Sequence, residues 1–130
     1  TISNVNSYVS VTYTATSGSV YAGGVLGSVP SSTVTNIVNY ADITSQTGST
    51  MLGGVVGYAN VDSTFIRCIN YGAVNSKGKQ VGGIVGASKT ATIAFCENYG
   101  SVTATSSLGN IVGQLTSSSK IFKSSLLIII

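Results

Sequence analysis

The sequence contains no histidine, no tryptophan and a single proline. Histidine is the commonest general base and metal ligand near neutral pH, so its absence argues against acid–base enzymes and histidine-bound metals. Charged residues make up 7% of the chain, against about 25% in a typical soluble domain. Only three of them are acidic, and three acidic residues do not easily build a calcium or magnesium site. We therefore expect no enzymatic activity, no cofactor and no bound metal.

The remaining composition is dominated by small polar residues. Serine and threonine account for 36 of the 130 residues, and their hydroxyl groups could accept O-linked sugars in a secreted protein. The net charge of +3 comes from scattered basic residues, so nucleic acid is not an expected partner. The length fits one domain, residues 1–130. No apolar run reaches the roughly 18 residues of a membrane span, so membrane contact is expected only if the last apolar run continues in the native precursor.

An internal repeat runs through the chain, and glycine marks its first motif. The motif is Gly-Gly, two apolar residues and Gly. It begins at Gly23, Gly53 and Gly82, and in a weakened form at Gly109. Nucleotide loops also carry such glycines, but no Lys-Ser/Thr pair and no helix follow here. We expect instead that the glycines allow close backbone approach, or a positive φ, at a corner of the repeat.

The second motif is Asn-Tyr with an apolar residue three positions after the tyrosine. Its tyrosines are 32, 31 and 28 residues apart, and the first copy has serine in place of asparagine. The positions concerned are Asn39, Asn70 and Asn98, with Tyr8, Tyr40, Tyr71 and Tyr99. The two motifs together divide the chain into repeats of residues 1–32, 33–63, 64–91 and 92–118, followed by an apolar strand or cap at 119–130.

The spacing of the two motifs predicts where the loops lie. The distance from the glycine pair to the next tyrosine is 17, 18 and 17 residues, whereas the return distance varies from 15 to 10. Insertions are best tolerated at the surface, so we place loops at Thr44–Thr50, Asn75–Lys79 and Thr103–Leu108. Elsewhere β-branched residues alternate with serine and threonine, which indicates strands and no helix.

Stacking of the repeats explains how such short strands bury an apolar face. A repeat of this size has no core of its own, but each copy can cover its neighbour, with equivalent positions about 4.8 Å apart. We therefore predict an all-β fold, a right-handed parallel β-solenoid of about four coils of 28–32 residues. Two columns are predicted to point inward: Val11, Ile43, Val74 and Val102, and Val5, Ile37, Cys68 and Cys96.

The repeat resembles a known family. The string at 82–86, Gly-Gly-Ile-Val-Gly, is followed after a spacer by Cys-x-Asn-Tyr-Gly-x-Val at 96–102. This pattern is similar to GLUG-type repeats of secreted and cell-surface proteins, and the likeness extends over residues 1–113. The resemblance implies a right-handed parallel β-helix that serves as a stalk or adhesive surface, located outside the cell or on its surface.

Three kinds of column are candidates for a disulfide or a binding function in addition to packing. Cys68 and Cys96 could form a disulfide outside the cell, but in-register side chains point the same way, which favours a ladder of buried free thiols. The asparagine and tyrosine columns could bind a ligand, sugars in the case of tyrosine, although stacked amides and rings also simply stabilise neighbouring coils. The threonine pairs at 12–16, 33–35 and 103–105 are interpreted as different columns, which argues against a flat ice-binding surface.

The two ends of the predicted stack are expected to associate. The sequence begins in mid-repeat, which leaves Thr1, Ile2 and Val5 without a covering coil, and a soluble solenoid needs polar caps. At the other end, Leu126, Leu127, Ile128, Ile129 and Ile130 have the composition of a strand donated to a neighbour. The hypothesis is an extracellular structural module that stacks head to tail as a homo-oligomer or filament, or forms a surface stalk. The alternative is an adhesin that binds glycan or host protein through its variable loops.

Overall fold

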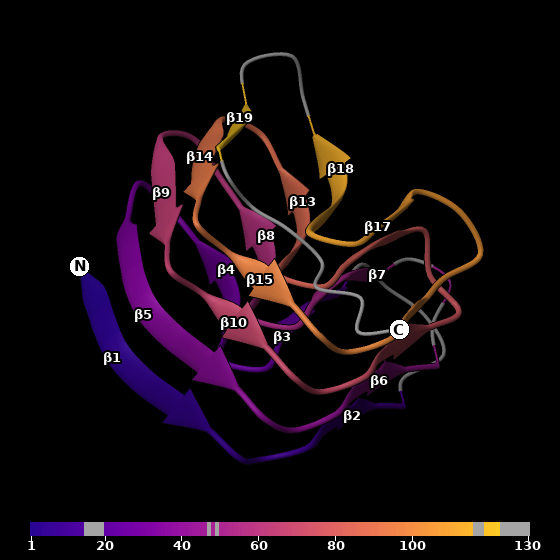
Figure 1. The fold of residues 1–130 in the computed structure, drawn as a ribbon. Helices are drawn as coiled ribbons and strands as arrows, with labels where there is room; N and C mark the ends of the chain where they lie inside the picture. The colour runs from indigo at the N-terminus through magenta and orange to yellow at the C-terminus, as the bar shows by residue number, and fades with distance from the viewer. Residues whose placement is uncertain (15–19, 47, 49, 116–118, 123–130) are drawn as a thin grey trace, which may run out of the picture.

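The computed structural model describes residues 1–14, 20–46, 48, 50–115 and 119–122. Every regular element in these ranges is a β-strand, and none is a helix. The strands form four sheets, and all pairings within them are parallel. Figure 1 shows the strands of successive coils lying side by side, with β1 at the outer edge. The predicted all-β, parallel β-solenoid of about four coils is therefore confirmed.

Each coil contributes to each sheet in turn. The first sheet contains β1 (Ile2–Ser7), β5 (Thr33–Asn39), β9 (Ser63–Ile66), β10 (Ile69–Asn70), β14 (Ala91–Ala94), β15 (Glu97–Asn98) and β19 (Lys120–Phe122). The second contains β2 (Val11–Tyr13), β6 (Ile43–Ser45), β11 (Val74–Ser76) and β16 (Val102–Thr103). The third contains β3 (Val20–Gly23), β7 (Thr50–Gly53), β12 (Gln80–Gly82) and β17 (Leu108–Gly109). The fourth contains β4 (Leu26–Val29), β8 (Val56–Ala59), β13 (Val85–Ser88) and β18 (Val112–Leu115).

The core is made of columns of apolar side chains that repeat from coil to coil. Val74 pairs with Ile43 on one side and with Val102 on the other, and Val11 pairs with Ile43. Ile43 and Val74 are fully buried, whereas Val11 and Val102, in the outer coils, are half-buried. Burial therefore increases toward the middle of the stack, because only the inner coils are covered on both sides.

The loops are shorter than the spacing predicts. β6 continues to Ser45, β11 to Ser76 and β16 to Thr103, so the first residues of each predicted loop belong to strands. The strands persist because these residues stand at a constant distance from the preceding tyrosine, before the variable segment begins. Three to four residues separate each of these strands from the next strand of the chain.

The same register corrects the prediction for the threonines. Thr12 pairs with Thr44, Thr44 with Asn75, and Asn75 with Thr103, so Thr12 and Thr103 share one column. All four stand four residues after a motif tyrosine, which keeps them aligned. Thr33 lies in another column, as predicted. Asn75 interrupts this column, so the prediction of separate columns was wrong for Thr12 and Thr103. The column of Thr33 is continuous, because Thr33 pairs with Thr64 and Thr64 pairs with Thr92.

One corner of the solenoid has a left-handed backbone conformation in every coil. The φ angles are 58° at Asn4, 55° at Asn36, 53° at Arg67 and 55° at Phe95. Asparagine tolerates this conformation better than other residues that have a Cβ atom. Side chains also connect the column, since Asn36 Nδ2 donates to Asn4 Oδ1 at 3.1 Å and Arg67 Nε donates to Asn36 Oδ1 at 2.9 Å. The arginine is therefore at a position that asparagine suits better.

R67N should raise the free energy of unfolding by about 0.5 kcal/mol, because asparagine reduces the cost of the left-handed conformation. Its amide can also donate to Asn36, as Asn36 donates to Asn4. Urea unfolding followed by circular dichroism measures the change. R67Q is the matched control, because glutamine has the same amide without the preference for positive φ. Equal stabilities of R67N and R67Q would contradict the explanation.

Candidate functional site

The asparagine column forms a continuous ladder inside the stack. Asn39 Nδ2 donates to Asn70 Oδ1 at 2.8 Å, and Asn70 Nδ2 donates to Asn98 Oδ1 at 2.8 Å. Each amide also bonds the backbone two residues on: Asn70 Nδ2 donates to the Gly72 carbonyl at 2.8 Å, and the Gly72 N–H donates to Asn70 Oδ1 at 3.2 Å. All three asparagines are fully buried. The ladder therefore holds each coil to the next and closes a tight turn within each coil.

The ladder ends differently at the two sides of the stack. In the first coil Ser7 takes the asparagine position, and its hydroxyl donates to the Gly24 carbonyl at 2.9 Å. In the last coil Asn98 Nδ2 donates to Oδ1 of Asn110 at 3.0 Å. Asn110 stands where the other repeats have the second glycine of their motif. No buried side-chain nitrogen or oxygen in the described part of the chain lacks a hydrogen-bond partner.

The glycines of the first motif make this ladder possible by leaving room for it. A Cβ atom on Gly24 would lie 2.6 Å from Cγ of Asn39, and one on Gly54 would lie 2.6 Å from Oδ1 of Asn70. A Cβ atom on Gly23 would lie 2.6 Å from the Val55 carbonyl oxygen. None of these glycines has a φ in the left-handed region, so close approach, rather than a positive φ, explains them.

The tyrosine column forms a strip on the outside of the stack. We call Tyr8, Tyr40, Tyr71 and Tyr99 the tyrosine strip. Neighbouring ring centroids are 4.7, 5.2 and 5.1 Å apart, with interplanar angles of 3°, 8° and 13°. Exposure is 69% at Tyr8, 45% and 46% at the middle rings and 36% at Tyr99. The inner rings thus cover each other's faces and present their edges and hydroxyl groups to solvent.

One hydroxyl group of the strip has an acidic partner. The Tyr99 phenol donates to Oε2 of Glu97 at 2.6 Å. This hydrogen bond, assisted by the negative charge of Glu97, raises the pKa of Tyr99 above its ordinary value, because it stabilises the protonated phenol. Glu97 belongs to β15, two residues before Tyr99.

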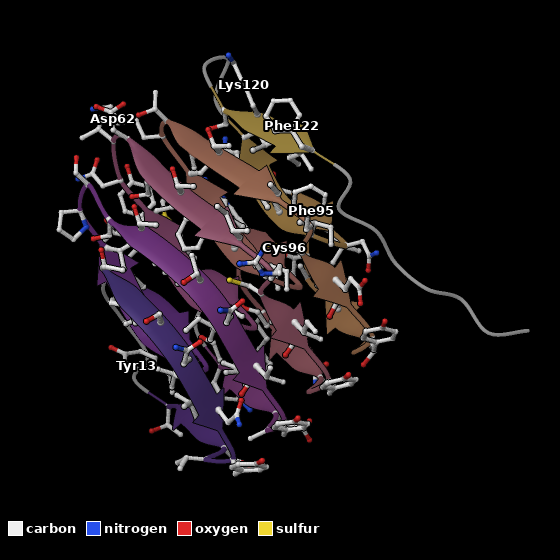
Figure 2. The ribbon with its side chains drawn as sticks, turned by 60° about the vertical axis from the view of Figure 1, so that its left-hand side comes forward. Tyr13, Asp62, Phe95, Cys96, Lys120 and Phe122 are labelled. Atoms are coloured by element: carbon white, nitrogen blue, oxygen red, sulfur yellow. The ribbon has the colours of Figure 1, made fainter. Side chains whose placement is uncertain are left out.

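The two cysteines lie side by side in the interior. Cys68 and Cys96 are thiols that are fully buried in the column that also contains Ile37. Figure 2 shows Cys96 inside the stack, whereas Phe95 and Phe122 lie at its surface. The hydrogen bond with the Cys96 sulfur, followed by burial, holds the pKa of the Cys68 thiol far above its ordinary value. A neutral thiol of this kind is a poor nucleophile, so the pair packs as small apolar side chains.

The residues predicted to associate lie partly within the described structure. Thr1 is exposed, and Ile2 and Val5 are half-buried on β1. The run from Leu126 to Ile130 lies outside the described residues. The three acidic residues are dispersed, and no group of three or more metal-ligating side chains occurs in the described ranges. No helix among the described residues is long and apolar enough to cross a membrane.

Two features were missed by sequence reasoning. Asn110 was interpreted only as a weakened glycine motif, and the sequence offered no sign that its side chain meets Asn98. Tyr21 and Tyr58 also stack, with ring centroids 5.1 Å apart and an interplanar angle of 26°. They come from different columns, β3 and β8, so no repeat position links them.

Comparisons with protein-family models, curated proteins and solved structures found no match to this chain.

Proposed function

We propose that this chain is an extracellular structural repeat module that stacks end to end into a filament or forms a surface stalk. The observation that carries the proposal is the state of the outer coils. Among the described strands, β1 to β4 at one end and β15 to β18 at the other pair on one side only. Such edges favour pairing with a further coil, from the same chain or from another copy.

The buried polar side chains and thiols support a structural role more than a catalytic one. The buried polar side chains of the described residues bond to each other and to the backbone, and both cysteine thiols lie in the core. The resemblance to GLUG-type repeats, carried by the motifs alone, favours an extracellular or cell-surface location. A head-to-tail contact between copies would be heterologous and would not close, so it would produce fibres of increasing length.

Electron microscopy of the purified chain at increasing concentration tests the proposal. We expect fibres that lengthen with concentration. V9K should shorten or abolish them, because Val9 is 71% exposed on the first coil and a lysine there would meet the incoming copy. V61K is the control, since Val61 is exposed on a turn between coils. Discrete particles at every concentration would contradict self-assembly, and fibres of V9K equal to those of V61K would contradict the role of the first coil.

A second candidate function is adhesion through the variable loops. The described loop residues bond to the neighbouring coil, because the Gln46 N–H donates to the Tyr13 carbonyl, the Lys77 N–H to the Ser45 carbonyl, and the Thr105 N–H to the Gly78 carbonyl. Saturable binding of a glycan or host protein by the monomer, lost when residues 77–79 are replaced by Gly-Ser-Gly, would favour this function. The same replacement should leave fibre assembly unchanged.

A further inference from the structure

The tyrosine strip has the arrangement that oxidative coupling of phenols requires. Coupling needs two phenol rings close together and reachable by an oxidant. The strip supplies three successive pairs with centroids 4.7 to 5.2 Å apart, and every ring is at least 36% exposed. Each ring belongs to a different coil, because β-strand pairing places successive tyrosines in one column. A bond between two of them would therefore join two coils.

We propose that the tyrosine strip is a site of dityrosine formation, in which hydrogen peroxide and a peroxidase-type oxidant join neighbouring coils covalently. Each of two phenols loses one electron and one proton and becomes a tyrosyl radical. The radicals form a carbon–carbon bond between ring positions ortho to the oxygens, and the two displaced ring hydrogens move to the oxygens. Hydrogen peroxide accepts the two electrons and two protons and is reduced to two water molecules.

Glu97 gives the reaction a preferred starting point. A phenol that has lost an electron is strongly acidic, and the Tyr99 hydroxyl already donates to the Glu97 carboxylate at 2.6 Å. The proton can therefore pass to Glu97 as the electron leaves, and Glu97, which is half-buried, can return it to solvent. Tyr71, whose ring centroid is 5.1 Å from that of Tyr99, is then the neighbouring partner. Glu97 is a proton acceptor in this scheme and forms no bond to carbon.

The aryl–aryl bond lies in the plane of each ring, so the stacked rings must turn from a face-to-face to an edge-to-edge arrangement. The side chains have room for this rotation because between 36% and 69% of each one is exposed to solvent. Their backbones stay one strand spacing apart, so the reacting rings are held at a high effective concentration throughout. Tyr13 shares its column with Ser45 and lacks such a neighbour. Tyr21 and Tyr58 form the one other stacked pair of the described residues. Both must be replaced by phenylalanine in the test, because this pair could also form dityrosine.

The experiment compares variants with equal numbers of tyrosines. Y13F/Y21F/Y58F leaves the four strip residues as the only tyrosines of the seven in the chain. In this background, adding Y8F/Y99F leaves the adjacent Tyr40 and Tyr71, whereas adding Y40F/Y99F leaves Tyr8 and Tyr71 two coils apart. Each protein is treated with horseradish peroxidase and hydrogen peroxide at low protein concentration, after circular dichroism has shown equal folding. Dityrosine fluorescence and the mass of the monomer are then measured.

The adjacent pair should give a monomer lighter by two hydrogens, with about tenfold more dityrosine than the separated pair, because proximity alone differs. Equal yields in the two variants, or dityrosine found only in covalent dimers, would overturn the proposal. The role of Glu97 is tested with E97Q. It should slow coupling about tenfold where Tyr71 and Tyr99 are the remaining pair, and leave the Tyr40–Tyr71 pair unaffected. An equal effect on both pairs would contradict proton transfer to Glu97.

Discussion

N70D should lower the free energy of unfolding by about 4 kcal/mol at pH 7, because it leaves buried hydrogen-bonding groups without partners. Asn70 is fully buried, and its Nδ2 donates both to Asn98 and to the Gly72 carbonyl. A carboxylate has nearly the same shape but donates neither bond, and it places a negative charge against two oxygens. Urea unfolding measures the decrease in the free energy of unfolding, and the fraction folded without denaturant shows whether the variant folds.

The cost of N70D should decrease in acid. Burial and the facing oxygens raise the pKa of the introduced carboxyl in the folded state above its unfolded value of about 3.9. Folding therefore favours the protonated form, so the penalty is smallest below the unfolded pKa and increases as pH rises toward the folded pKa. The protonated acid still donates one of the two bonds. Unfolding at pH 3.5 and 7, each relative to the wild type at that pH, measures the difference.

N75D is the matched control for this prediction. Asn75 follows Asn70 in the same coil, in β11 on the outer face of the second sheet, and its side chain is partly exposed. The same chemical change there should alter the free energy of unfolding by no more than about 0.5 kcal/mol at either pH. A pH-dependent loss of similar size in N75D would show that the effect comes from added charge and not from the ladder.

The periodic part of the structure could be predicted because each column repeats its chemistry. Ile43 and Val74 keep one inward position apolar, and Asn39 and Asn70 keep another as an amide, so parallel stacking aligns equal residues. A column of this kind is visible in the sequence without any knowledge of the contacts. The strands at Ser45 and Ser76 were missed because serine in the variable segment resembles a loop residue.

The contacts that escaped prediction join different positions of the repeat. Asn110 reaches Asn98 from the glycine column, and Tyr21 meets Tyr58 from another sheet. Neither contact follows from the spacing of the repeat motifs. Each joins two residues from different columns, and the distance between columns is not visible in the sequence. The association of the stack's ends likewise remains a proposal, since repeat periodicity sets what lies within the stack and not what meets its ends.

G54A should lower the free energy of unfolding by about 3 kcal/mol, because the space that a methyl group needs is already filled. The added Cβ atom would meet the Gly83 carbonyl oxygen and the Asn70 amide, and the backbone cannot move without breaking contacts between coils. Gly24 N–H donates to the Gly54 carbonyl at 3.2 Å, and Gly54 N–H donates to the Gly82 carbonyl at 3.3 Å. Thermal and urea unfolding of the variant measure the loss.

G48A separates this steric effect from the general behaviour of glycine. A Cβ atom on Gly48 would have no atom of the described residues within 4 Å, and Gly48 has no left-handed φ, so the variant should be neutral or more stable by up to about 1 kcal/mol. Equal losses in G54A and G48A would contradict the close-packing explanation. Asn110 shows why the position matters: it occupies the glycine column of the last coil, where no described strand lies beyond it, and there a side chain completes the ladder instead of colliding with it.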